Sequence, residues 1–268
     1  MRKKERVVFC TYSSIYSSIV LKQLIEHECI DVVAIVNSTR VLHPKYGHIR
    51  GAIEQIRVSG LQYSSYLFAV TDLFSWLQPF FRLQRKGLKT VHGLAAQYDI
   101  PILDCLDINQ QDAVDFIVDS KPEYLLAAHF NQLVKPSLLN LPSIDCINIH
   151  PSLLPYYKGV DPVFFAQLNN EEKFGVSVHE MAESFDTGRV LLQHSVDTVT
   201  LESTLSINKK LFLAGANLAI NWMCQTDKTV ISIQERNNLD YDSWPTSDQV
   251  HQFKKSGKSF LSLSELWV

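Results

Sequence analysis

The sequence lacks an excess of basic charge. Lysine and arginine together number 25 and aspartate and glutamate 28, which gives a formal net charge of -3 and an isoelectric point near 6.3. A nucleic-acid-binding domain usually carries a strongly basic face, and nothing in this composition indicates one. Polyanionic partners are therefore disfavoured.

Cysteine is also scarce, and its placement fits neither a disulfide framework nor a short metal motif. The number of cysteines is odd, they are far apart, and most lie inside apolar runs typical of strands: Cys10, Cys29, Cys105, Cys146 and Cys224. We therefore expect reduced thiols rather than disulfides or a metal cluster.

Long hydrophobic runs are missing as well. The N-terminus Met1–Arg6 is basic, but the apolar run behind it is short and is broken by the polar residues Thr11–Ser14, which excludes a signal peptide of the usual form. The aromatic-rich stretch at about 51–89 is interrupted by Asp72 and by two serines, so it does not read as a transmembrane helix. We expect a cytoplasmic protein without a membrane partner.

What is present is a hydrophobic fraction of 46%, enough for a sizeable core, and a regular alternation of strand-like and helix-like periods. The apolar, β-branched runs predict strands at Arg6–Cys10, Asp31–Val36, Ile100–Leu103, Tyr124–Ala128, Asp145–Ile149, Phe174–Glu180 and Val190–His194. Helical spacing occurs at Ile15–His27, Thr90–Tyr98, Gln110–Ser120 and Leu205–Trp222. This alternation predicts an α/β fold with a mostly parallel, doubly wound sheet and helices on both faces.

Polar residues follow one of these strands. Asn148 and His150 lie two apart at the end of the strand 145–149, so their side chains project to the same face. Ligands of such folds bind at the carboxyl ends of the strands. An amide, an imidazole and the carboxylate of Asp186 together suit acyl transfer to an amine, which needs donors for an oxyanion and a group that accepts a proton.

Simpler interpretations remain open at this point. Asn148 and His150 could be a hydrogen-bonded structural pair, and Asp186-Thr187-Gly188 could be an ordinary turn in which aspartate caps the backbone and glycine takes positive φ. His150, His179 and Asp186 could instead bind a metal ion through two imidazoles and one carboxylate, which would suggest a hydrolase.

Four separated motifs carry a resemblance to a known family. The chain from about Leu88 to Trp222 resembles the 10-formyltetrahydrofolate-dependent formyltransferase superfamily, which includes methionyl-tRNA, glycinamide ribonucleotide and sugar N-formyltransferases. The matching segments, in order, are Phe130–Val134, Ile147–Gly159, Gly175–His179 and Phe185–Gly188.

The resemblance implies a Rossmann-like catalytic domain at 1–225, with an insertion at about 51–89, and a short C-terminal extension at 226–268. Asn148, His150 and Asp186 fall on the family's catalytic residues. The family's binding site for 10-formyltetrahydrofolate, a co-substrate used without a metal, falls on Gln132, Leu133, Val134, Ala182, Glu183, Ser184 and Phe185.

The departures from the family bear on the acceptor. The turn Thr11–Ser14 contains no glycine for a phosphate cradle, which disfavours glycinamide ribonucleotide. About 44 residues follow Cys224, too few for the barrel that tRNA formyltransferases append. We therefore expect a small-molecule amine acceptor, either an amino sugar or an amino-acid derivative, and no nucleic acid. Methionyl-tRNA formylation, hydrolysis of 10-formyltetrahydrofolate and a non-catalytic folate-binding role are the alternatives.

Two segments have several interpretations. The stretch 51–89 fits extra core or a homodimer-forming helix, a lid over the acceptor pocket, or an interfacial membrane helix. In the tail, Thr246 or Ser247 before Asp248 fits the cap of a helix at Gln249–Lys255, whereas Tyr241 and Trp244 could fold back over the acceptor site.

Overall fold

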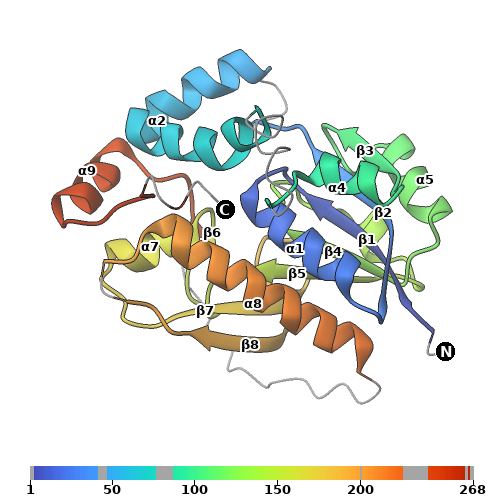
Figure 1. The fold of residues 1–268 in the computed structure, drawn as a ribbon. Coiled ribbons are helices and arrows are strands. Elements are labelled where there is room, and N and C mark those ends of the chain that lie inside the picture. Colours follow the sequence, from blue (N-terminus) through green and yellow to red (C-terminus); the bar gives the residue numbers. More distant parts are fainter. Residues whose placement is uncertain are drawn as a thin grey trace.

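A seven-stranded sheet forms the centre of the molecule (Figure 1). The structure is a computed structural model and describes residues 3–41, 47–76, 87–199, 201–225, 241–262 and 265. The strand order is β3-β2-β1-β4-β5-β7-β8. The first five strands in this order are parallel, and β7 is antiparallel to both β5 and β8. The bounds are β1 (Glu5–Thr11), β2 (Ile30–Ser38), β3 (Ile102–Cys105), β4 (Tyr124–Ala128), β5 (Asp145–His150), β7 (Phe174–Glu180) and β8 (Val190–Val196).

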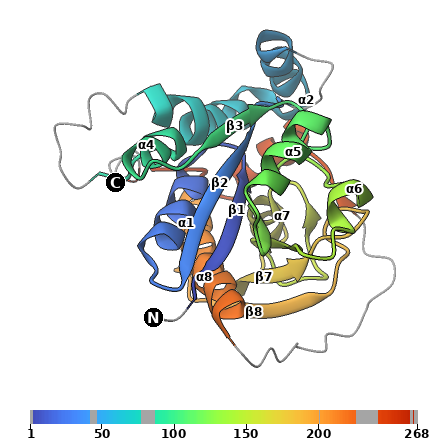
Figure 2. The ribbon, with the colours of Figure 1, turned by 90° about the vertical axis from the view of Figure 1, so that its right-hand side faces the viewer.

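Helices cover both faces of this sheet (Figure 2). One face packs against α1 (Ile15–Glu26), α4 (Val91–Gln97) and α8 (Thr204–Cys224), and the other against α5 (Gln111–Asp119) and the single turn α6 (Pro136–Leu139). The predicted α/β, mostly parallel, doubly wound fold is confirmed. The predicted strands and helices agree with the observed ones to within about two residues at most ends.

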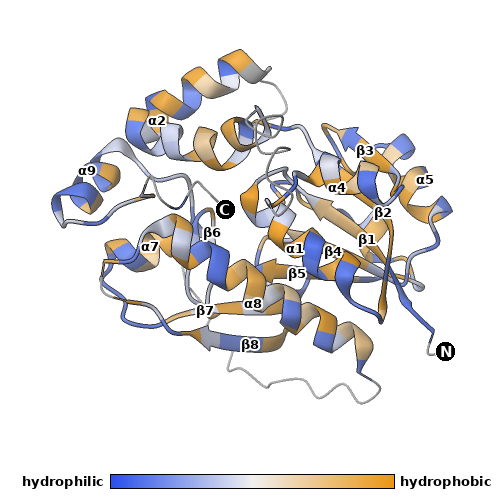
Figure 3. Ribbon diagram, in the orientation of Figure 1, coloured by the Kyte–Doolittle hydropathy of each residue, from blue (hydrophilic) through white to orange (hydrophobic). Residues whose placement is uncertain are grey.

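The strand β1 explains why the pattern could be read from the sequence. Val7 and Phe9 point into the core under α1 and α8, whereas Val8 and Cys10 point into the core under α5. All four side chains are fully buried, because successive residues of a strand face opposite sides of a sheet and both sides are covered here. Figure 3 shows the result as central strands that are mostly apolar beneath helices that carry both kinds of residue.

The stretch 51–89 forms a long helix, α2 (His48–Phe68), with a kink at Gly60, followed by a π-helical turn η1 (Ala69–Leu73). Tyr63 and Tyr66 of α2 are buried in the main core, which favours the extra-core interpretation for this part. The rings of Phe164 and Phe260 contact Tyr63, and Phe260 also stacks on Tyr66. Phe253 stacks in turn on Phe260. Residues 77–86, with Phe80, Phe81, Arg82, Arg85 and Lys86, lie outside the described residues.

The chain after 240 returns to this region. Helix α9 (Ser247–Lys255) packs against α2 and α7 (Pro162–Leu168), and its Val250 and Phe253 join the main core. Thr246 caps α9 as expected, since its hydroxyl accepts from the N–H of Gln249 while the Gln249 side chain accepts from the N–H of Thr246. The predicted domain division at 225 stays a prediction. Within the described parts of the chain, none of the helices has the length and apolar character needed to cross a membrane.

Close packing of α8 on β5 generates a stability prediction. A Cβ added at Gly215 of α8 would lie 2.4 Å from Cγ2 of Ile149 and 2.9 Å from Cγ2 of Val176. We expect Gly215→Ala to push α8 away from the sheet and to lower the free energy of unfolding by about 1–3 kcal/mol, which urea titration would measure. The control is Gly47→Ala, because a Cβ there meets nothing within 4 Å. Equal effects in both variants would contradict the packing argument.

Candidate active site

A large pocket opens at the carboxyl ends of the parallel strands. Its volume is about 1100 Å³, and its walls come from residues that follow β1, β2, β4 and β5, from α2 and η1, and from the loop after β7. Such a position is where ligands of doubly wound sheets bind, because the strand ends there leave a crevice between loops. All three predicted catalytic residues line this pocket.

Strand β5 brings Asn148 and His150 to the pocket. Ile147 and Ile149 are buried in the core under α8, so the alternation of the strand turns Asn148 and His150 to the opposite face. Asp186 comes from the loop after β7. Its Oδ1 lies 3.4 Å from Nδ1 of His150, and the His150 and Asp186 side chains are 5% and 9% exposed. The structure thus brings the three predicted residues together, with His150 and Asp186 almost fully buried.

His179 completes this cluster, although sequence reasoning considered it only as a metal ligand. It lies opposite Asn148 in the register of β5 and β7, and its Nε2 is 3.0 Å from Nδ2 of Asn148 and 3.7 Å from Oδ1 of Asp186. The sign of this role in the sequence is that Asn148 and His179 are polar residues on two strands that pair with each other. That signal becomes visible only when the antiparallel register is known.

The protonation of His179 fixes the direction of the Asn148 amide. Burial, with a smaller contribution from His150, lowers the pKa of His179 to about 4, so the ring is neutral at pH 7. Its Nδ1 lies 2.7 Å from the carbonyl oxygen of Glu180 and therefore carries the proton. The Nε2 lone pair then accepts one N–H of Asn148, and the second N–H of this amide remains for a ligand.

This arrangement also bears on the metal interpretation. A metal ion held by His150, His179 and Asp186 would need the Nε2 lone pair of His179, which Asn148 already occupies. Nε2 of His150 donates to the carbonyl oxygen of Tyr157 at 2.8 Å, which leaves Nδ1 facing Asp186. The geometry favours a hydrogen-bonded acid–base cluster over a metal site.

The carboxylate of Asp186 is held by a neighbouring backbone. Its Oδ2 accepts the N–H of Gly159 at 2.8 Å. Asp186 itself has positive φ (53°), whereas Gly188 does not. The expectation that glycine supplies the positive φ of this turn was therefore wrong. Gly188 is required for space, because a Cβ there would lie 1.8 Å from the carbonyl oxygen of Glu180.

The segment 157–161, called here the clamp loop, contacts two of the catalytic side chains. Tyr157 accepts from His150 through its carbonyl oxygen, and Gly159 donates to Asp186. Within the clamp loop, β6 (Lys158–Gly159) pairs in parallel with β9 (Tyr241–Asp242). Gly159 has φ 111°, and a Cβ there would lie 2.1 Å from the carbonyl oxygen of Asp242. The pairing therefore depends on glycine.

Helix α2 holds the other end of the clamp loop. The hydroxyl of Tyr63 donates to Oδ2 of Asp161 at 2.9 Å, and the N–H of Phe164 donates to Oδ1 at 3.2 Å. Burial raises the pKa of Asp161 to about 6, although the hydrogen bonds from Tyr63, Phe164 and Asn208 favour its charged form. Asp161 thus caps α7 and joins α2 to the loop that positions Asp186.

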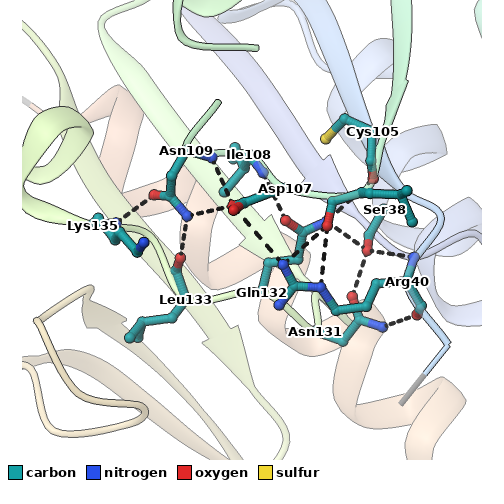
Figure 4. A network of polar contacts seen from close by, with 11 residues as sticks. Ser38, Arg40, Cys105, Asp107, Ile108, Asn109, Asn131, Gln132, Leu133 and Lys135 are labelled. Atoms are coloured by element: carbon teal, nitrogen blue, oxygen red, sulfur yellow. Dashed lines mark hydrogen bonds and ion pairs between the residues drawn. The ribbon is translucent and has the colours of Figure 1, made fainter. Parts of the chain in front are cut away.

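The predicted folate-binding segment is held by a polar network (Figure 4). Oε1 of Gln132 accepts the N–H of Ile108 at 2.7 Å, and its Nε2 donates to Oγ of Ser38 at 2.8 Å. Asn109 donates to the carbonyl oxygen of Leu133 at 2.9 Å. Since the Gln132 side chain is buried and used internally, its part in a site is to fix the backbone of 132–134.

The loop after β7 forms another wall of the pocket. Ala182, Ser184 and Phe185 line it, whereas Glu183 is exposed and does not. The ring of Phe185 lies 6.1 Å from that of Tyr241. Burial, and to a smaller extent Asp186, raises the pKa of Tyr241 to about 12, so its hydroxyl is neutral at pH 7. Tyr241 and Trp244 both line the pocket, so the tail caps a helix and also folds back over the site.

Comparison with known proteins agrees with this geometry. A family model described as formyl transferase matches residues 90–221. Methionyl-tRNA formyltransferase of Thermotoga maritima is 27% identical over 148 residues, which cover 55% of this chain and 47% of that protein. The chain spans about half the length of the curated relatives it matches first.

Solved structures share the fold. A sugar N-formyltransferase from a Shewanella species has a TM-score of 0.55 at 16% identity, covering 97% of this chain and 81% of that one. A sugar 3N-formyl transferase, solved in the presence of dTDP and 5-N-formyl-THF, has a TM-score of 0.56 at 16% identity and covers 91% and 70%. The family model, the sequence relatives and the shared fold together confirm the resemblance to the formyltransferase superfamily.

The neutral state of His179 can be tested by NMR. We expect its ring to titrate near pH 4, because burial disfavours the charged form. The unfolded chain takes up this proton near pH 6.5, so the free energy of unfolding should fall as the pH drops from about 6.5 to 4. In His179→Gln this decline should be shallower. A His179 midpoint near 6.5 would contradict the assignment of the Asn148 hydrogen bond.

The connection between α2 and the clamp loop gives a second prediction. Tyr63→Phe removes the hydroxyl that donates to Asp161, and we expect it to lower the free energy of unfolding by about 1.5–3 kcal/mol. Amide exchange at Gly159 should become faster, because the clamp loop loses one of its fastenings. Tyr66→Phe is the control: Tyr66 is buried on the same helix, but its hydroxyl bonds to Tyr16. Equal acceleration at Gly159 in both variants would refute the connection.

Proposed function

We propose that this protein is an N-formyltransferase that moves the formyl group of 10-formyltetrahydrofolate to the amine of a small acceptor without a phosphate group. The observation that carries the proposal is the convergence of Asn148, His150 and Asp186 in one pocket of a chain that resembles this superfamily. No metal is needed for the reaction as written below.

The proposed reaction takes place at the cluster of Asn148, His150 and Asp186. The unprotonated acceptor amine attacks the formyl carbon, a C–N bond forms, and the formyl oxygen becomes an oxyanion. The second N–H of Asn148 is the donor that stabilises this oxyanion, and His150, whose Nε2 donates to Tyr157 and whose Nδ1 faces Asp186, acts beside it on the carboxylate that carries the proton. Asp186, directly or through a water molecule, accepts the proton of the amine and passes it to the folate nitrogen. The bond between that nitrogen and the formyl carbon then breaks, which releases tetrahydrofolate and the formamide.

The positions of the donors matter because the side chains of His150 and Asp186 are almost fully buried. Hydrogen bonds aimed at a developing charge are worth more in such a site than in water, and they need no rearrangement during the reaction. His179 contributes by fixing the Asn148 amide, and the clamp loop contributes by fixing Asp186. These residues act through the catalytic groups and are positioning residues.

The co-substrate assignment rests on the pocket wall at Leu133, Val134 and Ala182. These residues line the pocket, and the first two belong to the backbone stretch held by the network around Gln132. An apolar wall beside backbone donors and acceptors suits a flat pterin ring. The presence of 5-N-formyl-THF in a structural neighbour supports the same assignment.

The charge of the pocket walls bears on the class of acceptor. Among the residues that the structure describes, the pocket walls carry three carboxylates, of Asp72, Asp161 and Asp186, and one guanidinium, of Arg40. The Arg40 group is already bonded to the carbonyl oxygen of Leu106. Ser14 caps α1 by accepting the N–H of Ser17, so this helix end is partly satisfied. These walls favour a neutral or cationic amine over a phosphate ester.

Two other activities are alternatives to this proposal. Methionyl-tRNA formylation is the activity named for the sequence relatives, so it is a candidate here. Hydrolysis of 10-formyltetrahydrofolate would use the same three residues with water in place of the amine. The negative charge of the described pocket walls disfavours methionyl-tRNA formylation. Hydrolysis is distinguished from formyl transfer only by whether the rate depends on an amine.

Release of tetrahydrofolate from 10-formyltetrahydrofolate, followed by absorbance, tests the proposal. The enzyme is assayed alone and then with amino sugars, amino acids and charged tRNA. We expect acceleration by a phosphate-free amine. Turnover independent of any amine would mean a hydrolase, acceleration by charged tRNA alone would mean the tRNA activity, and no turnover under any condition would contradict the formyl-transfer proposal.

Variants connect the rate to the cluster. Asn148→Ala and Asp186→Ala should each lower turnover by about 10²–10³-fold, because each removes a group that acts in the transition state. Glu172→Ala is the control, since Glu172 is exposed and does not line the pocket. Near-normal turnover of the Asn148 or Asp186 variant, with the control unchanged, would overturn the assignment of roles.

A further inference from the structure

Three side chains with metal-binding atoms meet at the end of the molecule where α1 and α8 finish. His27 follows α1 directly, Cys29 follows two residues later, just before β2, and Cys224 is the last residue of α8. One ligand atom from each lies within 4.8 Å of the other two. The cluster was not expected from the sequence, because Cys224 is far from the other two along the chain.

The cluster is separate from the candidate active site. Phe212 of α8 lines the active-site pocket, and Cys224 lies twelve residues further along the same helix. At a rise of 1.5 Å per residue, this separation is about 18 Å. A ligand held by this cluster would therefore bind independently of the proposed formyl transfer.

The kinds of atoms indicate which ion would bind. Two thiolates and one imidazole are preferred ligands of Zn²⁺ and of other thiophilic ions, whereas Mg²⁺ and Ca²⁺ prefer oxygen. Zn–S bonds of about 2.3 Å and Zn–N bonds of about 2.0 Å place tetrahedral ligand atoms roughly 3.5 Å apart. The three side chains therefore need to move by only about 1 Å, and a water molecule can complete the tetrahedron.

The electrostatics of the two helices favour a cation at the same place. Helices α1 and α8 both point their C-terminal ends, which carry partial negative charge, towards the cluster (Figure 1). Neither helix has a basic residue in its last turn. A cation at the cluster would be stabilised by both helix ends in addition to the ligand atoms.

Access and geometry are also suitable. All three residues are partly exposed, so an ion can reach them from solvent. Nδ1 of His27 accepts the backbone N–H of Cys29 at 3.3 Å, a long contact that binding of an ion to this ring would replace. None of the five cysteines is in a disulfide.

We propose that His27, Cys29 and Cys224 form a binding site for one thiophilic divalent ion of the Zn²⁺ class. The ion would join the end of α8 to the turn between α1 and β2. Binding would deprotonate the two thiols and release their protons to solvent, with no change in oxidation state. Its role is structural, because the site lies at the opposite end of these helices from the active-site pocket.

Titration of the reduced, full-length protein with Co²⁺ tests the site. We expect one equivalent to bind, with an absorption band from thiolate-to-cobalt charge transfer, and Zn²⁺ to displace it. The band should be lost in the double variant Cys29→Ser/Cys224→Ser and kept in Cys146→Ser, which alters a partly buried cysteine outside the cluster. Absence of the band in the unaltered protein, or its persistence in the double variant, would overturn the proposal.

A second measurement needs no variant. Saturating Zn²⁺ should protect Cys29 and Cys224, but not Cys146, from alkylation, as peptide mapping would report. It should also raise the melting temperature, because the ion binds the folded chain in preference to the unfolded one. The site would be refuted if Zn²⁺ left the alkylation of Cys29 and Cys224 unchanged. It would also be refuted if these two cysteines formed a disulfide and the thiols obtained by reducing it did not bind the ion.

Discussion

The hydrogen bond from the backbone of Gly159 to Asp186 connects the rest of the molecule to its candidate chemistry. Asp186 sits on a turn with positive φ, which aspartate adopts more readily than most residues, and its carboxylate takes its direction from a hydrogen bond outside that turn. The clamp loop supplies that direction, and it also supplies the carbonyl oxygen that accepts from His150. Because one short segment contacts both groups, their separation depends on how that segment is anchored.

The anchors come from parts of the chain that are distant in sequence. Asp242 of β9 pairs with Gly159, and Tyr63 of α2 bonds to Asp161. The aromatic residues around Tyr63 bury both segments in one core, and such burial is the main stabilising term for them. The described segments 51–76 and 241–262 are thus part of the support of the site, and side chains from both also line its pocket.

Much of the fold could be predicted because the governing pattern is local. The strands β1, β2 and β4 are buried on both faces and read as apolar runs, and α8 reads as a long apolar helix. The same argument located Asn148 and His150 at a strand end. It did not find α7, β6 or β9, because these elements are short and their residues are fixed by contacts with distant segments. Nor did it find the role of His179, whose partner Asn148 lies on another strand.

The sequence by itself determined the succession of the main strands and helices, the face on which Asn148 and His150 lie and the resemblance to the formyltransferase superfamily. These properties follow from periodicity and from motifs, which neighbouring residues carry. Only the tertiary structure decided that His179 holds the Asn148 amide, that the clamp loop holds Asp186, and that Cys29 lies near Cys224. Each of these depends on distances between residues far apart in the chain, and the long-range packing of the folded core sets such distances.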